Sequence, residues 1–70
     1  MTLEGQLSRE HFGGEVWVLR TADGQYELKG RVPAALDGRR VRVKASRAKE
    51  AYGFSMVGTI VNVESISPVG

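Results

Sequence analysis

The chain has 70 residues, no cysteine and two prolines. Without cysteine it can form neither a disulfide framework nor a thiolate zinc site, and it has no thiol nucleophile. Its longest strictly apolar run, residues 16–19, is far shorter than the roughly 20 residues of a membrane-spanning helix. The N-terminus has no basic segment followed by an apolar stretch. We therefore expect no secretory signal, no membrane partner and a cytoplasmic location.

The short length also limits the kind of site that the chain can build. A domain of this size buries only about 60% of the surface that its unfolded chain exposes. Hydrophobic residues make up 41% of the sequence, which is enough for one small core. We expect a single soluble domain over residues 1–70, with little room for an enclosed active site.

Positive charge is concentrated in the second half of the chain. The formal net charge is +2, but residues 1–38 carry −2 and residues 39–70 carry +4. All six cations of the second half lie between Arg39 and Lys49. A sequence pI near 9.4 with clustered arginine is typical of nucleic-acid binders. The same net charge is also ordinary for a small β domain whose charged side chains keep it soluble and its strand edges unpaired.

Alternating apolar residues predict five strands, at residues 2–8, 15–21, 25–32, 39–47 and 55–67. In the fourth of these we expect Val41, Val43 and Ala45 to point inward, with the residues between them pointing outward. Ile66 falls out of step with the alternation of the last strand, which predicts a β-bulge near residues 64–65.

The Asp-Gly pair at residues 23–24 predicts a hairpin between the second and third strands. If these two residues are the whole loop, Leu19 faces Leu28 and Trp17 faces Gly30. This pairing predicts one inward face, formed by Trp17, Leu19, Tyr26 and Leu28. Arg20 then points to solvent.

Residues 33–36 predict a short helical turn between the third and fourth strands, with Leu36 closing one end of the core. Five strands around such a turn favour a closed barrel, because closure removes exposed sheet edges. The predicted fold is all-β, a five-stranded OB-fold-like Greek-key barrel with a short helical turn between strands 3 and 4. An SH3-like barrel is the nearest alternative, but its helical turn usually precedes the last strand.

Residues 38–43 (Gly-Arg-Arg-Val-Arg-Val) and 61–66 (Val-Asn-Val-Glu-Ser-Ile) resemble the last two strands of small bacterial OB-fold domains. In those domains a Gly-x-x-Val-x-Val strand is followed by a Val-x-Val-x-x-Ile strand. Residues 17–28 resemble the second and third strands of an uncharacterised family of single-domain OB-folds. The resemblance covers nearly the whole chain and implies a fold, not an activity.

OB-folds commonly bind oligonucleotides on the outer face of strands two and three, between two flanking loops. In this chain the two loops are residues 9–14 and 47–54. The face between them carries cations, named below, and the apolar residues Val16 and Val18. Cations contact phosphates and aromatic rings stack on bases in single-strand binders. The predicted nucleic-acid-binding residues are Arg20, Lys29 and Arg31 on the face, Arg47 and Lys49 at its rim, and Phe12 and Tyr52 for stacking.

A denser basic stripe, Arg40, Arg42 and Lys44, lies on the fourth predicted strand, beside this face. It either extends the track of phosphate contacts or is a solvated surface.

Residues for catalysis are scarce. His11 is the only histidine, so no second imidazole can complete a transition-metal site. The glycines at 13–14 precede a strand and lack the Gly-Lys-Ser/Thr ending of a phosphate loop. We predict that the protein is not an enzyme and uses neither a metal nor a cofactor.

Two functions fit these residues. The first is a non-catalytic module that binds single-stranded DNA or RNA weakly and with little sequence preference. The second is a protein-interaction or self-assembly module, in which the outward-facing Val16 and Val18 form an apolar strip buried in a homodimer or against a protein partner.

Overall fold

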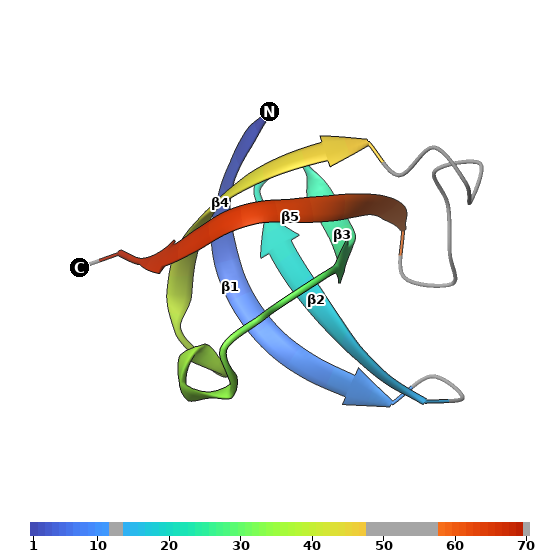
Figure 1. Ribbon diagram of the computed structural model, residues 1–70, viewed down its shortest axis with the longest axis vertical. Helices are drawn as coiled ribbons and strands as arrows, with labels where there is room; N and C mark the ends of the chain where they lie inside the picture. The colour runs from blue at the N-terminus through green and yellow to red at the C-terminus, as the bar shows by residue number, and fades with distance from the viewer. Residues whose placement is uncertain (12–13, 48–57, 70) are drawn as a thin grey trace.

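The computed structural model of the protein describes residues 1–11, 14–47 and 58–69. Five strands in this part of the chain form a closed barrel in the spatial order β1-β2-β3-β5-β4 (Figure 1). The elements are β1 (Thr2–His11), β2 (Glu15–Thr21), β3 (Gly24–Lys29), the 3₁₀ turn η1 (Ala34–Leu36), β4 (Arg40–Arg47) and β5 (Thr59–Pro68). The predicted all-β barrel with a helical turn before the fourth strand is confirmed. β1 runs further than predicted, and β3 ends three residues earlier, at Lys29 rather than residue 32.

Barrel closure depends on β1, which pairs with two different strands. Its first half is antiparallel to β4 and its second half is antiparallel to β2. Gln6 lies at the changeover, opposite both Arg40 and Arg20. Because β4 returns beside β1, the neighbouring strands β4-β1-β2-β3 form a Greek key. β3 and β5 pair in parallel and complete the barrel.

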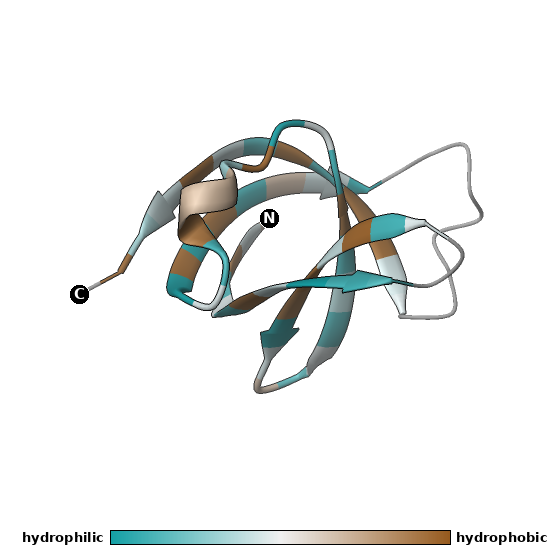
Figure 2. Ribbon diagram, turned by 90° about the horizontal axis from the view of Figure 1, so that it is seen from below, coloured by the Kyte–Doolittle hydropathy of each residue, from teal (hydrophilic) through white to brown (hydrophobic). Residues whose placement is uncertain are grey.

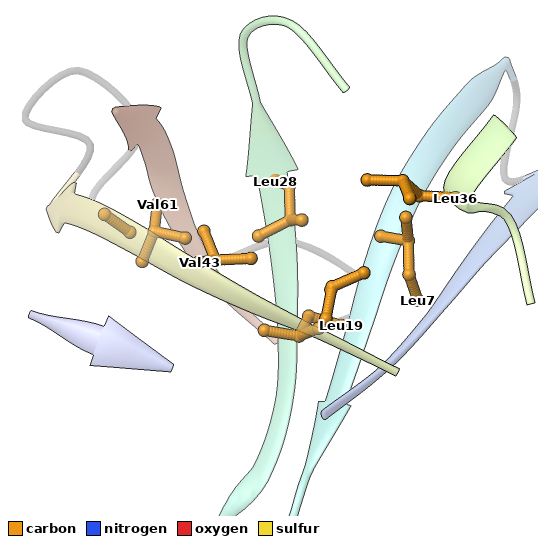
Figure 3. Packing of buried hydrophobic residues seen from close by; sticks show 8 residues of the cluster. Leu7, Leu19, Leu28, Leu36, Val43 and Val61 are labelled. Carbon is orange, nitrogen blue, oxygen red and sulfur yellow. The ribbon is translucent and has the colours of Figure 1, made fainter. Parts of the chain in front are cut away.

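Alternate residues of the strands fill the barrel interior. Bands of hydrophobic and hydrophilic colour follow one another along the strands (Figure 2). The buried cluster is Leu7, Leu19, Leu28, Leu36, Val41, Val43, Ala45 and Val61 (Figure 3). Trp17 and Tyr26 are partly buried and pack against this cluster, whereas Arg20 is exposed. The predicted inward face is therefore confirmed, as is the predicted place of Leu36 in the core.

The β2–β3 hairpin closes one residue earlier than predicted. Its two-residue loop is residues 22–23, and Thr21 is paired with Gly24. The Thr21 hydroxyl accepts a hydrogen bond from the Asp23 N–H at 3.1 Å and donates one to the Gly24 carbonyl at 3.0 Å. Gly24 has a φ of +138°, which side-chain-bearing residues rarely adopt. The glycine thus serves as the first residue of β3 rather than the second residue of the loop.

This shift changes the partners across the hairpin but not the faces of the strands. Leu19 lies opposite Tyr26, and Trp17 lies opposite Leu28, so the predicted pairing of Trp17 with Gly30 is wrong. Each β2 residue has moved by two positions relative to β3. Because side chains alternate with a period of two, such a shift keeps every side chain on its original side of the sheet.

The predicted bulge is present in β5. Lys44 pairs with Ser65 and Ala45 pairs with Val63, which leaves Glu64 as the extra residue. The bulge brings Ile66 back into step, so that it is partly buried against the core. The first predicted residues of this strand, 55–57, lie outside the described residues.

A substitution at Gly5 tests the close approach of the β1 backbone to Arg20 of β2. A Cβ at this position would collide with the backbone carbonyl of Arg20, which no rotamer change can relieve. We expect Gly5→Ala to lower the free energy of unfolding by at least about 3 kcal/mol, at the upper end of overpacking effects. The matched control is Gly38→Ala, where a Cβ meets open space and only the φ of +80° is unfavourable. We expect that control to cost about 1–2 kcal/mol. Urea unfolding followed by circular dichroism measures both, and equal losses would contradict the proposed collision.

Candidate functional site

The outer face of β2 and β3 carries the predicted cations Arg20 and Lys29, but each of them is paired with a carboxylate. The Arg20 Nη2 atom lies 3.4 Å from Glu10 Oε2, and the Lys29 Nζ atom lies 3.5 Å from Glu27 Oε2. Arg20 is paired with Gln25 across the β2–β3 hairpin. Gln25 precedes Lys29 by four residues on β3, so Arg20 and Lys29 lie roughly 13 Å apart along the hairpin. These four charges cancel, and the two cations do not converge.

The centre of this face is buried. Val18, Glu27 and Ile60 are neighbours across β2, β3 and β5, with exposed fractions of 1%, 7% and 5%. They alternate with residues of the core cluster and are not part of it. Val16 is half-buried. The apolar strip that the sequence predicted for self-association is therefore not exposed. Among the described residues, the large hydrophobic residue that is exposed is Met1.

Of the other five predicted binding residues, two lie outside β2 and β3 and three lie outside the described residues. Arg31 is exposed in the connector that follows β3, and Arg47 is exposed at the end of β4. Phe12, Lys49 and Tyr52 lie outside the described residues. Of the seven predicted residues, the structure thus shows Arg20 and Lys29 on the expected sheet surface, some distance apart.

The strongest positive surface belongs to β4. Arg40, Arg42 and Lys44 are all exposed, and they alternate with the buried Val41 and Val43, as predicted. We call the outward side of this strand the β4 face. Its cations repeat every second residue, about 7 Å apart. They therefore form a regular line of positive charge on a rigid, hydrogen-bonded strand.

Polar side chains of β1 and β5 flank the β4 face. The two cross-strand rows are Glu4–Arg42–Ser67 and Thr2–Lys44–Ser65. Each central cation thus has a neighbour from β1 on one side and a serine from β5 on the other. Arginine, lysine and hydroxyl groups are the side chains that most often donate hydrogen bonds to phosphate oxygens.

Glu4 is the one described carboxylate that contacts the β4 face. Its Oε2 atom accepts a hydrogen bond from Arg40 Nε at 3.3 Å, and its Oε1 atom accepts one from Arg42 Nη2 at 3.1 Å. These hydrogen bonds, chiefly the one from Arg42, hold the pKa of Glu4 below its ordinary value of 4.5. Three cations against one carboxylate leave a net charge of +2 on the β4 face. The β2–β3 face carries none.

Several cations in the described part of the chain have no carboxylate within ion-pair distance among the described residues: Arg31, Arg39, Lys44 and Arg47. Lys44 and Arg47 belong to β4, and Arg39 directly precedes it. Uncompensated positive charge is thus concentrated on and next to this strand.

The sequence did not predict Glu4, Ser65 and Ser67 as polar neighbours of the β4 face. Alternation with Leu3 and Gly5 already places Glu4 outward, but its position beside Arg42 depends on the pairing of β1 with β4. The two serines reach the face because the bulge restores the register of β5.

Within residues 1–11, 14–47 and 58–69, no group of three or more His, Asp or Glu side chains is placed to hold a metal ion. His11 is exposed at the end of β1. No helix in the same residues has the length and apolar character needed to cross a membrane.

A comparison with known protein families gives one match over nearly the whole chain. The model described as "Protein of unknown function (DUF5818)" matches residues 4–69, and the chain belongs to this family. No curated protein and no solved structure gives a significant match.

The ion pairs of Glu4 predict a dependence of stability on pH. A carboxylate with a lowered pKa in the folded chain stabilises it fully above its unfolded pKa of about 4.5, and this contribution is lost as the pH falls through the lower folded value. We expect the wild-type chain to melt at a higher temperature than Glu4→Gln at pH 7, and this difference to shrink as the pH falls below 4.5. Glu64→Gln is the control, because Glu64 forms no ion pair within the described residues. A difference between wild type and Glu4→Gln that is constant from pH 7 to the acid limit would contradict this role.

Proposed function

We propose that this member of the DUF5818 family is a non-catalytic module that binds single-stranded nucleic acid through the β4 face. The observation that supports this most strongly is the net charge of +2 on the β4 face with Glu4 included, against zero on the β2–β3 face with Glu10 included. Each phosphate that a lysine or arginine neutralises releases counterions, which drives sequence-independent binding. A few such contacts give weak binding that falls steeply as salt rises.

The fold supports the same proposal. A five-stranded Greek-key barrel with parallel β3 and β5 and a 3₁₀ turn before β4 resembles an OB-fold. OB-folds bind oligonucleotides on the outside of the barrel. In this chain the paired charges and buried centre of the β2–β3 face favour β4 as the principal contact surface. The resemblance to small bacterial OB-fold domains agrees with the barrel architecture, and a bacterial source and cytoplasmic location stay predictions.

Self-assembly through an apolar strip has less support. Val18 is fully buried within the monomer and Val16 is half-buried. Burying them further in a dimer would remove little apolar surface from water, so it would stabilise a dimer only slightly.

Two double variants with equal net charge test which face binds. We expect Arg42→Gln with Lys44→Gln to weaken binding of a short labelled single-stranded oligonucleotide about tenfold or more at low salt. The slope of log K against log salt should become shallower by about 1.4, because each single-strand phosphate contact contributes about 0.7. Arg20→Gln with Lys29→Gln removes the same charge and should change the slope far less. Fluorescence anisotropy over a salt series measures both quantities.

The opposite ranking of the two double variants would assign the site to the β2–β3 face. No salt-sensitive binding by the wild-type chain, with a molecular mass in sedimentation equilibrium that rises with concentration, would instead favour self-assembly.

A further inference from the structure

Glu4 shows that the β4 face can hold an oxyanion. Its two carboxylate oxygens are each bound by a different arginine, Arg40 on one side and Arg42 on the other. Both arginines and the carboxylate are solvent-accessible, with exposed side-chain fractions of 59%, 59% and 36%. An external phosphate oxygen therefore has access to the same donors and needs only to replace an exposed carboxylate. Glu4 thus marks the donors that an external oxyanion would use.

Lys44, the next outward residue of β4 after Arg42, is a donor that no described carboxylate contacts. Lys44 has no described carboxylate within ion-pair distance and lies between the hydroxyl-bearing residues Thr2 and Ser65. It is one strand repeat, about 7 Å, beyond Arg42. This repeat is comparable to the distance between neighbouring phosphates along an extended nucleic-acid strand. In inorganic polyphosphate, whose phosphates share a bridging oxygen, the same repeat spans more than one phosphate unit. The β4 face therefore presents successive cationic sites to a backbone of linked phosphates.

Strand β4 carries no aromatic residue that could stack on a base. Trp17 and Tyr26 are the aromatic residues of the described chain, and both pack against the core. Base stacking is the main contact by which single-strand binders engage the bases themselves. The groups available on the β4 face are cations, hydroxyls and one carboxylate, which suit phosphate oxygens.

We infer that the β4 face recognises a chain of phosphate groups and not the bases, with Glu4 as the intramolecular competitor that the ligand displaces. Inorganic polyphosphate and an abasic oligonucleotide are then ligands of the same face as single-stranded DNA. This inference rests on the proposed function for the location of the site, and it extends that function to phosphate chains without bases.

A competition experiment distinguishes recognition of the phosphate chain from recognition of the bases. The full chain is titrated, at low salt, with a labelled single-stranded oligodeoxynucleotide, and the complex is challenged with an abasic oligonucleotide of equal length or with inorganic polyphosphate of equal phosphate number. We expect both competitors to displace the labelled DNA completely. In two-dimensional amide NMR spectra, all three ligands should shift the same signals of β4 and of the β1 residues beside it.

Glu4→Gln and Glu10→Gln provide matched variants, because each raises the net charge by one. Glu4→Gln removes the competitor of Arg40 and Arg42, whereas Glu10→Gln releases Arg20 on the other face. We expect Glu4→Gln to tighten binding of polyphosphate and of DNA by the same factor, up to about fivefold, which is the upper end of the range for an exposed ion pair. Glu10→Gln should tighten both by less than about twofold, through net charge alone.

Each other outcome has a distinct meaning. DNA binding that neither polyphosphate nor the abasic strand displaces would overturn this inference and leave the proposed function standing. Polyphosphate binding on β4 without DNA binding would support the inference and overturn the proposed function. Equal effects of Glu4→Gln and Glu10→Gln would overturn the role of Glu4 as competitor.

Discussion

The pairing of β1 with both β2 and β4 is the constraint on which the rest of the structure depends. It requires a residue without a side chain at Gly5, where the Arg20 carbonyl lies against the β1 backbone. Together with the other strand pairings, the pairing of β1 closes the barrel, which encloses the core and removes the free strand edges of a very short chain. The same pairing sets Glu4 beside Arg42, a residue 38 positions later in the sequence. Fold stability and the composition of the β4 face thus have one common cause.

The faces of the strands could be predicted from the sequence because alternation is a local property. Val41, Val43 and Ala45 are buried as expected, and the phase change before Ile66 correctly located the bulge. The hairpin register could not be predicted in the same way. It depends on the Thr21 hydroxyl hydrogen bonds and on Gly24 entering the strand, and the Asp-Gly pair alone fits two adjacent loop positions. The error was harmless for the faces only because it amounted to two residues.

The candidate site was harder to predict, because its electrostatics depend on which charges meet across strands. Arg20 and Arg42 look equivalent in the sequence, since each is an outward arginine on a predicted strand. Their difference arises from β1, which brings Glu10 to Arg20 and shares Glu4 between two arginines. The register of β1 with its two neighbours has no local sequence signal. A count of cations along the chain therefore identifies basic strands but does not show which of them keeps its charge.

Glu4 links the stability of the barrel to the binding capacity of the β4 face. Outward cations at alternate positions of one strand repel each other, and this repulsion destabilises the folded state of a domain with little free energy to spare. A carboxylate shared by Arg40 and Arg42 reduces the repulsion and holds both guanidinium groups in place. In the proposed binding mode, the same carboxylate lowers the affinity for an external anion, because the anion has to displace it. Stability and affinity therefore oppose each other at Glu4, as is common where a binding surface concentrates charge of one sign.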